Sequence, residues 1–272
     1  AAKLIWIASY PKSGNTWMRM LLGNYMHGTP GTPLGLNEIG AHIPSDRDES
    51  LYRGYCLRHN LRFEDVAGSL SHRDAMYGEL LAAKGDMFIK THACNHDQNG
   101  TPYYAPARTH GMIFIVRDPR DVLLSFAHHT QRSLDETLLM MQDKNFVATQ
   151  NGMTEFLSSW DQHAMSFMNA KVPKIVIRYE DLLADAAGVL RGVLGGFGQS
   201  VDEVRLQEVV KFSSFDSLKK QEGAGGFAEN PNAGQSFFRA GTAKQWQDKL
   251  APDMITAVET AFGPVMQKLN YL

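Results

Sequence analysis

Four short runs of apolar residues, rich in β-branched side chains, constrain the fold of this chain more than any other feature of its sequence. Segments with helical patterns separate each run from the next. Continuous apolar strands that alternate with helices are typical of a parallel sheet covered by helices on both faces. The sequence therefore predicts a three-layer α/β fold whose strands lie at residues 4–8, 87–90, 112–116 and 175–177.

Helices and long loops are predicted between these strands. Asp118 is placed to cap one helix and Pro119 to occupy its first turn, where the missing N–H group costs nothing. The predicted helices cover residues 16–26, 119–130, 134–142, 153–169, 180–192 and 252–268. Segments rich in Gly, Pro and Asn predict long surface loops, which in compact domains commonly act as lids or binding loops, at residues 27–44, 95–106 and 222–235.

The composition limits the classes of function. A chain of 272 residues with 43% hydrophobic residues can bury a full core, and no linker divides it, so we expect one domain over residues 1–272. The formal net charge of −2 provides no global basic field to attract nucleic acid or an anionic membrane. Any anion-binding site must therefore be local.

The sequence also suggests a compartment. No apolar run approaches the roughly 20 residues that span a bilayer, and the first residues lack the layout of a signal peptide. Cys56 and Cys94 are too few for a disulfide framework or a cysteine-based zinc site, which suits a reducing cytosol. We expect a cytoplasmic protein; a leader removed before Ala1 and a single disulfide between the two cysteines stay open as alternatives.

Residues 7–17, IASYPKSGNTW, join the first predicted strand to the first predicted helix through a turn that contains glycine. A strand, turn and helix in this order place backbone N–H groups and a helix N-terminus against an anion. A Walker A phosphate loop needs a lysine after its second glycine, whereas Lys12 precedes Gly14 and the upstream glycine is missing. From the topology alone, an ordinary strand-to-helix turn capped by Ser13 or Asn15 is equally compatible.

The string Tyr-Pro-Lys-Ser-Gly-Asn-Thr-Trp within this loop resembles the 5′-phosphosulfate loop of the sulfotransferases that use 3′-phosphoadenosine 5′-phosphosulfate (PAPS). The resemblance implies a P-loop-like fold, and it implies that Lys12 stabilises the leaving 5′-phosphate as negative charge develops there. Trp17 would stack on the adenine, with core packing against the sheet as the alternative. The implied donor-binding residues of the loop are Lys12, Ser13, Gly14, Asn15, Thr16 and Trp17.

The segment FIVRDPRDVLLS at residues 114–125 resembles the family's second signature, in which an arginine at a strand end and a serine on the next helix grip the 3′-phosphate. Arg117 and Ser125 match these positions, and a guanidinium can contact a phosphate through two parallel hydrogen bonds. Without the first motif, an ion pair of Arg117 with a neighbouring aspartate would be the simpler interpretation. Asp118 could also be read as a Walker B carboxylate for Mg²⁺, but its position before Pro119 favours capping.

The segment FIKTH at residues 88–92 resembles the K-T-H motif of cytosolic-type sulfotransferases, in which the histidine is the catalytic base. The resemblance assigns that role to His92, and Lys90 matches the lysine of the motif. A histidine with a pKa near neutrality can accept the proton of an acceptor hydroxyl while its oxygen attacks sulfur. The pair His128 and His129 is interpreted as helix surface or pocket wall, because no further ligand at metal spacing accompanies it.

Three later segments resemble the family less closely. IRYEDL at residues 177–182 and FSSF at residues 212–215 imply that Tyr179, Ser213 and Phe215 contact the nucleotide, with Phe215 facing Trp17 across the adenine. FRAGTAKQW at residues 238–246 resembles R-K-G-x-x-G-D-W, but alanine replaces the lysine, Lys244 the second glycine and Gln245 the aspartate. These departures put donor affinity and lid closure in doubt. The segment still implies 3′-phosphate contacts from Arg239, Ala240 and Gly241.

The resemblance implies in-line transfer of a sulfuryl group from PAPS to an acceptor hydroxyl, with 3′-phosphoadenosine 5′-phosphate (PAP) as product and without a metal ion. The acceptor is expected to be a phenolic small molecule or natural product, as in bacterial enzymes that act on glycopeptide antibiotics. No metal-binding residues are predicted. A Mg²⁺-ATP-dependent kinase and a non-catalytic nucleotide-binding module remain the alternatives. A homodimer is possible, although no dimerisation motif is evident in residues 249–272.

Overall fold

The computed structural model describes residues 1–63, 72–98, 101–150, 153–232 and 234–272. Its central sheet is parallel and has the strand order β2-β1-β5-β8. The pairing of Ile7 with Lys90 of β2 and with Ile113 of β5 places β1 between two strands that come later in the chain. All four predicted strands are confirmed, as β1 Leu4–Ser9, β2 Met87–Thr91, β5 Thr109–Val116 and β8 Lys174–Arg178.

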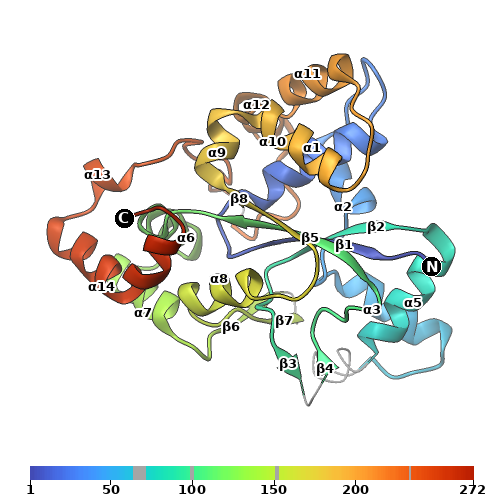
Figure 1. Cartoon of the computed structure of the whole chain (residues 1–272), viewed down its shortest axis with the longest axis horizontal. Helices are drawn as coiled ribbons and strands as arrows, with labels where there is room; N and C mark the ends of the chain where they lie inside the picture. The colour runs from blue at the N-terminus through green and yellow to red at the C-terminus, as the bar shows by residue number, and fades with distance from the viewer. Residues whose placement is uncertain (64–71, 99–100, 151–152, 233) are drawn as a thin grey trace.

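Helices cover both faces of this sheet (Figure 1). Alternate residues of β1 point to opposite sides, so that Trp6 joins one buried apolar cluster and Ile7 the other. This arrangement confirms the three-layer α/β fold. One layer contains α3 Glu49–Arg58, α5 Arg73–Lys84, α6 Pro119–Thr130, α7 Leu134–Gln142, α8 Trp160–Met168 and α14 Pro252–Lys268. The opposite layer contains α1 Asn15–His27, α2 Ile39–His42, α9 Tyr179–Ala184, α10 Ala186–Gly196, α11 Glu203–Phe212 and α12 Phe215–Gly225.

Two predicted helices differ from the structure. Residues 153–169 do not form one helix, because β7 Met153–Phe156 pairs antiparallel with β6 Val147–Gln150, and α8 begins only at Trp160. Long-range pairing has overridden the local pattern here. The helix predicted at residues 180–192 is two helices, because Asp185 has an extended φ of −146° and its side chain caps α10 by accepting from the Gly188 N–H group.

The predicted loops contain more regular structure than their composition indicates. Residues 27–44 include the 3₁₀ turn η1 Leu36–Glu38 and α2, and α12 continues through Gly225. Residues 95–106 include β3 Asp97–Gln98 and β4 Thr101–Pro102, while residues 99–100 and 233 of the predicted loops lie outside the described residues. None of the helices in the described part of the chain is long and apolar enough to cross a membrane.

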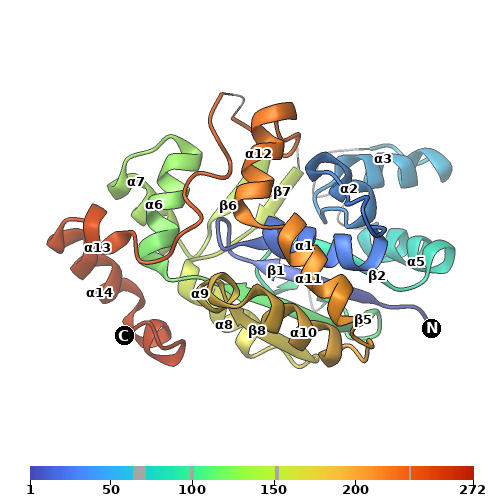
Figure 2. The ribbon, with the colours of Figure 1, turned by 90° about the horizontal axis from the view of Figure 1, so that it is seen from above.

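The carboxyl ends of β1, β2, β5 and β8 meet at one edge of the sheet, because all four strands are parallel. Ser9, Thr91, Val116 and Arg178 are the last residues of these strands. In open α/β sheets, ligands bind in a crevice at this edge. The crevice lies where the chain segments that follow two adjacent strands continue to opposite faces of the sheet. The chain that follows α12 passes between α12 and α6 on its way to α13 Trp246–Lys249 (Figure 2).

Candidate active site

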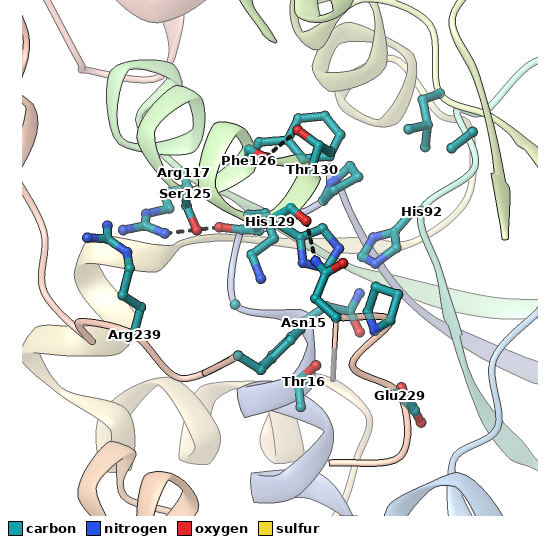
Figure 3. Close-up of a pocket in the computed structure, with 18 of the residues that line it drawn as sticks. Asn15, Thr16, His92, Arg117, Ser125, Phe126, His129, Thr130, Glu229 and Arg239 are labelled. Carbon is teal, nitrogen blue, oxygen red and sulfur yellow. Dashed lines mark hydrogen bonds between the residues drawn. The ribbon is translucent and has the colours of Figure 1, made fainter. Parts of the chain in front are cut away.

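A cavity of about 690 Å³ opens at this edge of the sheet. Of the 16 residues that the sequence singles out as donor-binding or catalytic, 14 line it; Ser13 and Ser213 do not. Figure 3 shows Arg117, Ser125 and Arg239 together at one end of the cavity and His92 at the other, with Asn15 and Thr16 between them. We refer to these ends as the donor end and the acceptor end.

The loop between β1 and α1 is shaped as a cradle for an anion. Lys12 and Gly14 both adopt left-handed backbone conformations, with φ of 66° and 100°. A Cβ atom on Gly14 would lie 2.7 Å from the Tyr179 ring, so the close approach of the loop to that ring requires glycine. No side chain caps α1, which leaves its first N–H groups available for an anion.

Neither proposed capping residue serves that role. Asn15 instead donates from Nδ2 to the Ile7 carbonyl oxygen over 2.9 Å, which ties the loop back to β1. The Ser13 hydroxyl oxygen is buried and has no hydrogen-bond partner within the described residues. A buried polar atom without a partner is unfavourable unless a ligand completes its hydrogen bond, so this orphaned hydroxyl fits a loop that holds a phosphate.

Arg117 follows β5 directly and contacts several parts of the donor end. Its Nη1 donates to the Lys12 carbonyl oxygen over 3.0 Å, and its Nη2 to the Thr242 carbonyl oxygen over 3.1 Å. The guanidinium carbon lies 4.3 Å from the centre of the Tyr179 ring, and Nε is buried without a partner among the described residues. Arg117 therefore joins three donor-end segments and retains an unsatisfied donor.

Asp118 caps α6, as predicted. Its carboxylate accepts from the Arg120 backbone N–H group over 2.9 Å and forms a buried ion pair with the Arg120 guanidinium, and Pro119 occupies the first turn. Because both interactions engage the carboxylate away from the cavity lining, Asp118 is not arranged as the Mg²⁺ ligand of a Walker B motif.

The segment at residues 239–246 closes the donor end. Gly241 has a φ of 61°, and a Cβ atom there would lie 2.4 Å from the Phe215 ring. Lys244, which replaces the second glycine of the family pattern, also has a positive φ, of 61°. Gln245, which replaces the aspartate, accepts from Arg239 Nη2 through Oε1 over 3.0 Å. Lys244 thus adopts the left-handed backbone conformation that glycine would favour at this position.

Aromatic rings line the cavity in the segments where the sequence predicts contacts to an adenine. Trp17 and Tyr179 line the cavity with their ring centres 6.1 Å apart and an interplanar angle of 67°, and Phe215 lines it from the start of α12. Ser213 is fully buried between α1 and α11, where its hydroxyl contacts Asn24 Nδ2 at 3.2 Å. Its place is structural in this arrangement, one residue before the Ser214 that caps α12.

His92 follows β2 at the acceptor end. Its Nδ1 lies 2.7 Å from the Ser9 carbonyl oxygen; since a carbonyl can only accept, Nδ1 carries the proton and Nε2 is left as a proton acceptor. Burial, and then the charge of Lys90, lowers the pKa of His92 well below 6.5. The neutral imidazole required of a general base is therefore the favoured form near neutral pH.

Two half-buried lysines, Lys12 and Lys90, line the cavity. Burial and the neighbouring Arg117 charge lower the pKa of Lys12 to about 7, and its Nζ lies 3.9 Å from the centre of the Phe237 ring. Burial also lowers the pKa of Lys90, against the opposing charges of Glu229 and Glu155. An anion bound beside them would favour the protonated form of both lysines, because partial burial weakens the solvation of their ammonium groups.

Comparison with known proteins identifies the family of this chain. The family model of the sulfotransferase domain matches residues 3–270. The chain belongs to the sulfotransferase family. Among curated proteins, a luciferin sulfotransferase of Photinus pyralis is 24% identical, with 92% of this chain and 68% of that protein covered. Sulfotransferase 2A1 of Rattus norvegicus is also 24% identical, with 96% and 83% covered.

Solved structures of sulfotransferase-like proteins share the fold. Retinol dehydratase in complex with androsterone and PAP superposes with a TM-score of 0.63 at 20% identity, covering 97% of this chain and 80% of that one. Mouse sulfotransferase SULT7A1 complexed with PAP gives a TM-score of 0.65 at 18% identity, covering 97% and 85%. The family resemblance, the P-loop-like fold and the assignment as a sulfotransferase enzyme are therefore confirmed.

Sequence reasoning did not anticipate several side chains in the acceptor end of this sulfotransferase. Arg47 precedes α3, Glu155 lies on β7, and Glu229 and Phe237 belong to the chain after α12. Each occurs in a segment without a family motif, and only its tertiary position brings it to the cavity. His129, interpreted from the sequence as helix surface or pocket wall, lines the cavity, and burial followed by the Lys12 charge lowers its pKa to about 4.

Proposed function

We propose that this sulfotransferase transfers the sulfuryl group of PAPS to a phenolic hydroxyl of a small molecule or natural product. The observation that carries the proposal is the convergence, in one cavity, of an anion cradle, two half-buried lysines and a neutral histidine with a free acceptor nitrogen. PAP complexes of two structural relatives support PAP and PAPS as its nucleotide partners.

The donor end fits PAPS by its own chemistry. The α1 N-terminus offers unsatisfied N–H donors to the 5′-phosphate, and Arg117, Ser125 and Arg239 surround a place for the 3′-phosphate. Trp17, Tyr179 and Phe215 provide faces for the adenine. PAPS supplies the transferable sulfuryl group; the protein supplies positioning and charge.

In the proposed reaction, His92 Nε2 accepts the proton of the acceptor hydroxyl as the oxygen forms a bond to sulfur. The bond between sulfur and the 5′-phosphate oxygen breaks, and its electron pair leaves with PAP. Lys12 stabilises the charge that develops on that oxygen, and Lys90 neutralises the sulfuryl oxygens. Alignment of the attacking oxygen, sulfur and leaving oxygen provides much of the acceleration.

The acceptor end suits a compound with an apolar ring. The walls of the cavity include aromatic and aliphatic side chains from separate segments of the chain, which can enclose a flat hydrophobic body. These side chains are Phe126, Met140, Phe146, Leu157 and Phe227. A phenol presents its hydroxyl at the edge of such a body, so that burying the ring brings the reacting oxygen toward the base.

Calorimetric titration with PAP in EDTA, beside ATP with Mg²⁺, tests the donor assignment. Tight metal-free binding of PAP with little response to ATP is expected, and a preference for ATP with Mg²⁺ would support the kinase alternative instead. Turnover of PAPS with a panel of phenols then tests the reaction. A His92→Asn variant should bind PAP as the parent does and lose turnover, whereas full turnover would remove His92 as the base.

A further inference from the structure

Glu155 is a buried carboxylate at the acceptor end. It lies on β7, is 3% exposed and lines the cavity. Its Oε1 accepts from the His92 backbone N–H group over 2.7 Å, and its Oε2 accepts from Arg47 Nη1 over 2.9 Å. Burying a carboxylate is unfavourable unless its oxygens are paired, and both oxygens are paired here.

We infer that Glu155 is a positioning residue, which holds the peptide of His92 so that the imidazole faces the acceptor hydroxyl. The inference rests on the base role of His92 in the proposed function. His92 follows the last residue of β2, where the strand ladder no longer supplies a partner for its N–H group. The Glu155 carboxylate provides that partner from the β6–β7 hairpin.

Two further hydrogen bonds complete the hold on His92. The His163 Nε2–H group donates to the His92 carbonyl oxygen over 2.9 Å, and the His92 ring donates from Nδ1 to Ser9 over 2.7 Å. The backbone N–H, the carbonyl and the ring are therefore each fixed by a different element. Loss of any one contact frees a rotation that moves Nε2 away from the line of attack.

Arg47 connects Glu155 to the strand that carries Lys90. Besides its ion pair with Glu155, its Nη2 donates to the Met153 carbonyl oxygen over 2.8 Å, which ties it to the start of β7. The preceding residue, Asp46, donates its backbone N–H group to the Lys90 carbonyl oxygen over 2.8 Å. The β6–β7 hairpin is thus joined to the segment beside the proposed base by a charge pair and backbone contacts.

The chain offers a matched control in Glu229. This carboxylate also lines the cavity and pairs with an arginine, through Arg19 Nη1 and Nη2 at 2.7 Å and 2.9 Å, but within the described residues it forms no hydrogen bond to His92. Removal of Glu155 or of Glu229 leaves one arginine without its carboxylate. Only removal of Glu155 also releases the His92 peptide.

The test compares Glu155→Ala, Glu155→Gln and Glu229→Ala. Glu155→Ala is expected to lower kcat about 100-fold, with the KM for PAPS and the affinity for PAP within about twofold of the parent. Glu155→Gln is expected to restore much of kcat, because its amide oxygen still accepts from the His92 N–H group. Hydrogen exchange of the His92 amide should be fast only in Glu155→Ala and slow in Glu229→Ala.

A double variant separates positioning from a merely structural ion pair. The double variant Arg47→Met with Glu155→Ala removes both charges, so it should regain thermal stability while kcat stays low. If Glu155→Ala alone does not fold, the double variant takes its place in the kcat comparison. Recovery of kcat in the double variant, or kcat of Glu155→Ala within twofold of the parent, would overturn the inference. If the parent protein shows no PAPS-dependent turnover, the proposed function is refuted. Hydrogen exchange of the His92 amide would then still test the contact between Glu155 and the His92 N–H group.

Discussion

Binding of PAP should draw a proton from solution onto Lys12. In the free protein, burial and the Arg117 charge lower the pKa of this lysine from 10.5 to about 7, and only Glu222 among the main neighbouring charges opposes them. This difference makes the protonated form about 5 kcal/mol less favourable in the loop than in water. A bound 5′-phosphate supplies the missing negative charge and restores the ammonium form.

The size of the proton uptake follows from the pKa of about 7. Lys12 is deprotonated in about one tenth of free molecules at pH 6, about half at pH 7 and about nine tenths at pH 8, and these fractions are the protons taken up on binding. The phosphate groups of PAP ionise near pH 6, so they are already dianions at pH 8 and contribute little there. Titration at pH 8 in two buffers with different ionisation enthalpies measures the uptake directly.

A Lys12→Arg variant provides the control. Its guanidinium stays protonated at all these pH values and keeps the positive charge in the cradle, so PAP should bind without proton uptake at pH 8. Heats that are independent of the buffer in the parent, or an unchanged uptake in Lys12→Arg, would refute the reasoning. The same lowered pKa requires that the free energy of unfolding rise with pH between about 7 and 10.5, because the unfolded chain binds the extra proton there.

Three further predictions follow from the site. The pKa of His92 lies well below 6.5, so the acidic limb of kcat/KM, where this histidine becomes protonated, should lie well below pH 6.5; an acidic limb at or above pH 6.5 would contradict the assigned environment. Gly241→Ala would force a Cβ atom to within 2.4 Å of the Phe215 ring at a positive φ and should weaken PAP binding at least about tenfold by calorimetry, whereas Gly225→Ala, which meets no atom within 4 Å, should leave binding unchanged. Asp121 accepts from the backbone N–H groups of Lys244 and Trp246 over 2.7 Å and 3.1 Å, so Asp121→Ala should cost about 1–3 kcal/mol for each bond lost and loosen the donor end; thermal unfolding and PAP titration measure both effects, and a variant as stable and as tight as the parent would show that the loop does not depend on this carboxylate.

Much of the fold is legible in the sequence because its central strands are buried on both faces. Such strands must be apolar along their whole length, so runs such as residues 112–116 stand out without any knowledge of neighbours. The helix cap at Asp118 could also be predicted from the sequence, because its carboxylate accepts a hydrogen bond from the backbone N–H group of Arg120, only two residues away. Residues 153–156 were predicted wrongly because their strand exists only through pairing with β6.

Most residues that line the donor end could be named from the sequence, because they belong to short, specific motifs and several of these motifs stand at strand ends. Lys12, Arg117 and Tyr179 each follow or close a central strand, and parallel strands bring such positions to one edge of the sheet. The exception is Ser213, which lies in the same short motif as the cavity-lining Phe215 but points into the core between two helices.

The sequence by itself determined the layered fold of this sulfotransferase and the sheet edge at which its cavity lies, because apolar strands and the motifs at their ends are each made of residues that are close in the chain. Only the tertiary structure decided which charged side chains accompany His92 in the cavity. Arg47, Glu155 and Glu229 come from segments far apart in the chain, and their charges lie in a buried cavity only because each is paired with a distant partner. Ion pairs between residues far apart in the chain produce no local hydrophobic periodicity and no short motif, so they cannot be predicted from the sequence.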